Sequence, residues 1–153
     1  ITRQTSSGQR HQWNETEYWQ EVNGKLSPAL AAALRHFYDW ALEKADRIKW
    51  GTGVTRGSFN PVFETISPRS FVTFFTDGTI QVSYAYLPVE EGDVNKRALR
   101  DALHKYIPTP GVSDVSDDKI ANVWPSFKPE IVEAHSEEIL KALKEFIAEN
   151  GHQ

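Results

Sequence analysis

The sequence predicts an α+β domain, in which an antiparallel sheet of about four strands carries the N- and C-terminal helices packed on one face. Apolar residues recur at helical spacing near both ends of the chain, and β-rich runs bounded by glycine and proline occupy the middle. The regular alternation of strand and helix that is typical of parallel sheets is absent from the sequence. The expected order is therefore two helices, four strands and two helices, with antiparallel pairing.

Two helices are expected before the first strand. Asn14, followed three residues later by Glu17, has the pattern of a helix N-cap, and Asn23-Gly24 is a typical helix end. Ser27-Pro28 then begins a second helix over about 28–45, because serine caps a helix and proline suits its first turn. Both helices carry an apolar stripe that can cover a sheet.

Strands are expected over 47–50, over 58–66 and in the two arms of a hairpin. Pro61 interrupts the second strand and indicates an edge or a bulge, since proline cannot donate a ladder hydrogen bond. Asp77-Gly78 is typical of a two-residue type I′ turn.

That turn would pair Phe75 with Ile80 and Thr73 with Val82. With Phe71, these residues would face the helices.

The C-terminal part is expected to return to helices. Asp93 can cap a helix over about 94–107 that ends before Pro108. An acidic loop over 112–120 and an extended, turn-rich segment over 124–129 follow. Ser136 can cap a last helix over about 137–149.

Length and composition indicate one domain over 13–150, preceded by a polar linker or tail over 1–12. The chain has 153 residues and 39% hydrophobic residues, which is too apolar for a disordered chain. No run approaches the ~20 apolar residues of a membrane span, so no membrane partner is expected. The absence of cysteine fits a cytoplasmic protein. Because the chain lacks methionine and begins with Ile1, we expect a domain cut from a longer protein.

Charge is distributed unevenly. The formal net charge is −4, with +2 over residues 1–75 and −6 over residues 76–153. Overall acidity argues against a dedicated non-specific nucleic-acid binder. A local basic patch is still predicted, because Arg47, Lys49, Arg56 and Arg69 cluster around a glycine-rich stretch, with only Glu64 as an acid among them.

The glycine-rich stretch is the part of the sequence that looks specialised for binding. Its predicted ligand-binding residues are Trp50, Gly51, Thr52, Gly53, Arg56, Gly57, Ser58, Phe59 and Arg69. In this hypothesis the two aromatic rings stack on a ligand, the glycines allow close backbone approach, and the arginines pair with phosphate. The alternative is a tight connection between strands, in which glycine solves backbone geometry and the aromatic rings are buried.

Other chemistry has little support in the sequence. The stretch lacks the Gly-Lys-Ser/Thr ending of a P-loop, and Ser58 lacks the complete nucleophile elbow. The histidines lack metal-binding spacing, and the Asp114–Asp118 segment lacks the glycine and closing glutamate of an EF-hand. We therefore predict no catalytic residues, no metal and no cofactor.

One combination of motifs resembles a known domain family. Trp50-Gly51-Thr52-Gly53 with Gly57-Ser58-Phe59, the hairpin at Asp77-Gly78 and the segment Trp124-Pro125-Ser126-Phe127 form this combination. It resembles a bacterial and archaeal domain of uncharacterised function that follows restriction-endonuclease-like nuclease domains or stands alone. The resemblance covers about residues 13–149 and implies an accessory module with an upstream nuclease-like domain as partner. The Glu-x-Lys signature of such nucleases is missing here.

The sequence therefore predicts a non-catalytic accessory module of a larger prokaryotic protein in a restriction or defence context. It would contact nucleic acid or a phosphate-bearing ligand through the loop 50–59. Two alternatives stay open. One is a small-molecule-binding or hydrolytic domain with a pocket between sheet and helices. The other is a protein-interaction or oligomerisation module in which an exposed Trp13, Trp19 or Trp124 marks the contact.

Overall fold

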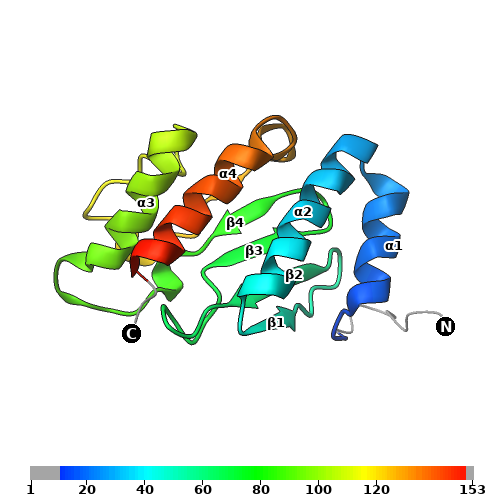
Figure 1. Cartoon of the computed structure of the whole chain (residues 1–153), viewed down its shortest axis with the longest axis horizontal. Coiled ribbons are helices and arrows are strands. Elements are labelled where there is room, and N and C mark those ends of the chain that lie inside the picture. Colours follow the sequence, from blue (N-terminus) through cyan, green and yellow to red (C-terminus); the bar gives the residue numbers. More distant parts are fainter. Residues whose placement is uncertain (1–10, 151–153) are drawn as a thin grey trace.

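The computed structural model describes residues 11–150, so the predicted linker over 1–12 lies almost entirely outside the described residues. Within 11–150, four α-helices and a five-stranded antiparallel sheet form an α+β fold (Figure 1). The strands follow one another across the sheet in sequence order. The predicted class is confirmed, with five strands in place of about four.

The two N-terminal helices are α1 (Glu15–Lys25) and α2 (Pro28–Lys44). Both predicted caps are confirmed, because the side chain of Asn14 accepts from the N–H of Glu17, and that of Ser27 accepts from the N–H of Leu30. The predicted end at Asn23-Gly24 is wrong. Helix α1 runs through Gly24 and ends only where Leu26 turns extended to lead into the cap of α2.

The first four strands are β1 (Arg47–Trp50), β2 (Ser58–Val62), β3 (Val72–Phe75) and β4 (Ile80–Val82). Strand β2 ends four residues earlier than predicted.

The edge or bulge expected at Pro61 is not found, because β2 is an inner strand between β1 and β3 and its register with β1 is regular through Pro61. Pro61 itself lies beyond the part of β2 that pairs with β3. It pairs with Ile48 of β1, while the pairing with β3 covers only Ser58 and Phe59. The missing N–H of Pro61 therefore interrupts no ladder bond.

The predicted register of the hairpin is wrong by one residue. Val72 pairs with Val82 and Phe74 with Ile80, because the connection is a three-residue loop. Gly78 closes this loop at φ +91°, a conformation that suits glycine. A shift of one residue exchanges the two faces of a strand, so Val72 and Phe74 face the helices and Thr73 faces away.

Strand β4 ends at Val82. Residues Tyr84–Tyr86 form a 3₁₀ turn, and the fully buried hydroxyl of Tyr84 donates to the carbonyl of Val112 at 2.7 Å. Burial raises the pKa of Tyr84 well above its usual value, so the phenol stays neutral and keeps its donor proton.

The C-terminal elements are α3 (Val94–Tyr106), β5 (Ser126–Phe127) and α4 (Pro129–Asn150). The segment expected to be only extended supplies the fifth strand, which pairs with β4. The last helix begins at Pro129, eight residues before the predicted start. Its backbone breaks at His135 (φ −132°), directly before the predicted Ser136 cap.

Strand register creates two parallel rows of side chains across the sheet. On the covered face, the row consists of Trp50, Phe59, Phe74, Ile80 and Phe127. One residue along each strand, the opposite face carries Lys49, Asn60, Thr73, Gln81 and Ser126. All four helices contribute to the core on the apolar side, and α3 lies beside α4 (Figure 1). We call the other side the open face. None of the helices within 11–150 has the length and apolarity needed to cross a bilayer.

Candidate functional site

A basic hollow of about 260 Å³ lies on the open face of the sheet, beside the glycine-rich loop. Its charged and polar side chains include Arg47, Lys49, Asn60, Arg69, Thr73 and Tyr86. Among the lining residues, all of which lie within 11–150, there are three cations and no carboxylate. In a chain of net charge −4, this is a local reversal of sign.

Two of the three cations have no salt bridge to any residue between 11 and 150. They are Lys49 on β1 and Arg69 in the connection before β3. The guanidinium carbon of Arg69 lies 3.5 Å from the centroid of the Tyr86 ring, so the ring holds it by a cation–π contact. Arg47 is paired, with 2.7 Å between its Nη1 and Oε2 of Glu64.

The floor of the hollow is built by hydrogen-bonded polar side chains. The side-chain amide of Asn60 donates to the carbonyl of Lys49 at 2.9 Å and to the hydroxyl of Ser58 at 3.2 Å. The hydroxyl of Thr73 donates to Oδ1 of Asn60 at 2.6 Å. These bonds fix the floor, so a ligand would meet cations whose surroundings are already ordered.

Trp13 packs against the glycine-rich loop and forms two hydrogen bonds with its backbone. Its backbone N–H donates to the carbonyl of Gly51 at 2.9 Å, and its indole Nε1–H donates to the carbonyl of Gly53 at 2.8 Å. A Cβ on Gly57 would lie 2.4 Å from the Trp13 ring, so close packing requires glycine there. Trp13 is 1% exposed and therefore cannot be the predicted exposed contact residue.

The predicted stacking of Phe59 on a ligand is wrong, because its ring is fully buried. It stacks on Phe74 with 4.7 Å between centroids and meets Tyr18 and Tyr38 edge-on. Trp50 is half-buried, with its ring toward the same two tyrosines, and it reaches the rim of the hollow.

Arg56 was predicted to bind a ligand together with Arg69, but it does not line the hollow. Its Nη1 donates to Oδ2 of Asp77 at 2.8 Å, and its guanidinium carbon lies 3.6 Å from the centroid of the Phe75 ring. Burial alone would raise the pKa of Asp77, but hydrogen bonds from Thr79 and Arg56 outweigh it and lower this pKa. Arg56 thus connects the glycine-rich loop to the hairpin.

The structure divides the nine predicted site residues into two groups. Those that line the hollow are Trp50, Gly51, Thr52 and Arg69; those that serve packing or local bonding are Gly53, Arg56, Gly57, Ser58 and Phe59. The lining residues that sequence reasoning missed include Asn60, Thr73 and Tyr86. A three-residue reading of the hairpin loop would have placed Thr73 on the open face.

Comparisons with known proteins leave the hollow without an assignment. No protein-family model, no curated protein and no solved structure matches the chain. Between residues 11 and 150, histidine, aspartate and glutamate form no group of three that could hold a metal ion. The function proposed below is therefore argued from the geometry of the hollow.

Proposed function

We propose that this chain is a non-catalytic accessory module that binds nucleic acid or another phosphate-bearing ligand through the basic hollow beside the loop 50–59. The observation that supports it is a hollow lined by three cations and no carboxylate, in which only Arg47 has a salt bridge within residues 11–150, in an acidic chain. The motif resemblance adds the proposed context of a cytoplasmic prokaryotic protein that also contains a nuclease-like domain.

Binding fits the hollow better than hydrolysis does. General acid–base catalysis needs a group that exchanges a proton near neutral pH, usually histidine or a carboxyl group with a shifted pKa. The ionisable side chains that line the hollow are Arg47, Lys49, Arg69 and Tyr86, and neither a histidine nor a carboxyl group is among its lining residues, which all lie within 11–150. Arginine and lysine side chains hold an anion without transferring protons.

The two cations without a salt bridge give the hollow its affinity for phosphate. Lys49 presents a mobile ammonium group, and Arg69 presents a planar guanidinium that can donate two parallel hydrogen bonds to phosphate oxygens. The Tyr86 ring leaves these donors unused, because it contacts the guanidinium through its face. Binding to both cations would weaken as salt rises.

Replacing either cation is expected to weaken the binding of a single-stranded oligonucleotide. We expect Lys49→Gln and Arg69→Gln each to lower affinity by roughly threefold to tenfold at about 50 mM salt, and each to reduce the slope of log affinity against log salt by about 1. Fluorescence anisotropy with a labelled oligonucleotide, repeated at about 200 mM salt, measures both quantities.

Lys144→Gln is the matched control, because it removes the same charge from an exposed position on α4. The affinity of Lys144→Gln for the oligonucleotide is expected to change only slightly. Equal losses in Lys144→Gln and Lys49→Gln would mean that binding follows net charge alone, and the proposed site would be wrong.

A further inference from the structure

We propose that the ligand of the open face is a single-stranded nucleic acid that runs from Lys49 on β1 to Trp124 beside β5. This inference rests on the proposed function and specifies its ligand. Four strand spacings of about 4.8 Å separate the two edges, so the path is roughly 19 Å long. That is more than one phosphate group needs and suits a short single strand.

The polar row provides hydrogen-bonding groups along this path. Asn60, Thr73, Gln81 and Ser126 are half-buried on the open face, one on each strand after β1. Amides and hydroxyls both donate and accept, so they can bond to base edges or to sugar and phosphate oxygens. The covered row is entirely apolar, which shows that the polar row is confined to the open face.

An aromatic pair lies at the far end of the path. The rings of Tyr86 and Trp124 meet edge-to-face with 5.9 Å between centroids. Trp124 is 47% exposed, and every other tryptophan between residues 11 and 150 is buried or half-buried. An exposed indole offers a face on which an unpaired base can stack.

Tyr86 connects the basic hollow with a second hollow. The second hollow has a volume of about 630 Å³, and its apolar lining consists of Val115, Val123, Trp124 and Pro125. Tyr86 lines the first hollow and contacts Trp124, which lines the second. A single-stranded nucleic acid with a phosphate group at Arg69 would therefore meet an apolar, partly aromatic surface next to Tyr86.

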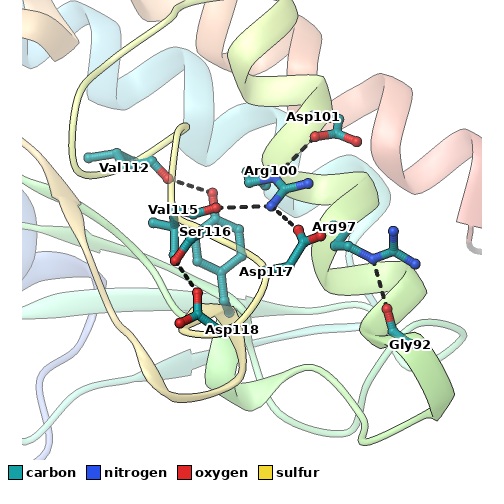
Figure 2. A network of polar contacts seen from close by, with 10 residues as sticks. Gly92, Arg97, Arg100, Asp101, Val112, Val115, Ser116, Asp117 and Asp118 are labelled. Carbon is teal, nitrogen blue, oxygen red and sulfur yellow. Dashed lines mark hydrogen bonds and ion pairs between the residues drawn. The ribbon is translucent and has the colours of Figure 1, made fainter.

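The acidic residues near the second hollow are already engaged. Asp117 forms a salt bridge with Arg100 of α3, and Asp118 accepts a hydrogen bond from the hydroxyl of Ser116 (Figure 2). Asp114 lines the hollow, but its carboxylate accepts from the N–H of Gly111 at 2.7 Å, and Lys119 lines the same hollow.

Arg100 also holds the wall of this hollow in place. It donates to the carbonyl of Val115 at 2.9 Å and therefore ties the loop to α3, as Figure 2 shows. The surface beside Trp124 is thus fixed before a ligand arrives.

Stacking on Trp124 requires an unpaired base, which separates a single strand from a duplex and from bare phosphate. We would measure binding by calorimetry with an oligothymidylate of about ten nucleotides, within the usual size of single-strand sites. The other probes are an oligouridylate of the same length, the corresponding duplex and inorganic tripolyphosphate. Tight binding of either single strand supports the inference.

We expect Trp124→Leu to weaken single-strand binding by about tenfold, the loss typical of one stacked base, and to leave tripolyphosphate binding unchanged. Trp124→Phe keeps an aromatic face and should retain most of the affinity. Leu42→Ala, which alters an exposed apolar residue on α2, is the control and should behave as wild type. All variants are first checked for folding by circular dichroism.

Three results would overturn the inference. The first is unchanged single-strand affinity in Trp124→Leu, and the second is a duplex that binds as tightly as the single strand. The third is tripolyphosphate binding that equals single-strand binding and depends on Arg69, which would leave the proposed function intact. If no probe binds, both the inference and the proposed function are wrong.

Discussion

Trp13→Ala is expected to lower the free energy of unfolding by about 3–5 kcal/mol, the usual loss when a buried tryptophan is truncated to alanine. The indole is buried to 1% exposure, lies against Gly57 and donates to the carbonyl of Gly53. Removing it leaves a cavity under the loop and an unpaired carbonyl. Since small domains have only about 5–15 kcal/mol of stability, such a loss approaches the whole.

Urea unfolding followed by circular dichroism measures this loss. If Trp13→Ala does not fold, Trp13→Phe keeps an aromatic ring but removes the indole hydrogen bond and part of the buried volume, with an expected loss below that of Trp13→Ala. The control is Trp124→Ala. Because the Trp124 indole is half-exposed, its removal should change the free energy of unfolding little. Similar midpoints for Trp13→Ala and wild type would show that Trp13 does not hold the loop.

Phe59→Ala is expected to lower the free energy of unfolding by about 3–5 kcal/mol, because the Phe59 ring is fully buried. It stacks on Phe74 and contacts Tyr18 and Tyr38, so truncation removes the centre of an aromatic cluster. Urea unfolding again measures the change.

Ligand binding distinguishes this core role from the stacking role predicted from the sequence. Phe59→Leu conserves most of the volume and should bind an oligonucleotide as wild type does. Tyr86→Leu, on the open face, should weaken oligonucleotide binding by several fold, since Tyr86 lines the hollow and supports Arg69. Normal binding by Tyr86→Leu together with weak binding by Phe59→Leu would contradict the assignment of both residues.

Most elements of the fold were predictable because their signals are local. The Asn14 and Ser27 caps and the strand 47–50 depend on neighbouring residues only. Helix α3 follows Asp93 as predicted, but the Asp93 side chain makes no cap hydrogen bond. The fifth strand is only two residues long, Ser126–Phe127, and forms by pairing with β4, which no short window of sequence reveals.

The hairpin shows why the faces of the sheet were harder to predict. Asp77-Gly78 fits both a two-residue and a three-residue connection, and the choice reverses every side chain in both arms. Both registers place phenylalanine on the covered face, Phe75 in one and Phe74 in the other. Contacts of Phe74 with Phe37 and Phe59 select the observed register, and these are tertiary contacts.

The candidate site was only partly predictable for a related reason. The basic residues near the glycine-rich stretch were apparent, but the sequence did not show that Asp77 engages Arg56 while Lys49 and Arg69 line one hollow. Tyr86 lies far along the chain and reaches the hollow only because the chain leaves β4 in a 3₁₀ turn. Gly57 belongs to the predicted stretch, but the group that a side chain at this position would meet is the Trp13 ring.

The most direct test of the binding site is a ¹⁵N-NMR titration of the protein with single-stranded oligothymidylate at low salt. Our account predicts that amide shifts concentrate on the open face and its rim, at Lys49, Asn60, Arg69, Thr73 and Tyr86. The chemical shifts of amides in the exposed turns of α1, α2 and α4 should not change. Shifts that cluster on those helices while the open face is unaffected would contradict the proposal that the basic hollow is the binding surface.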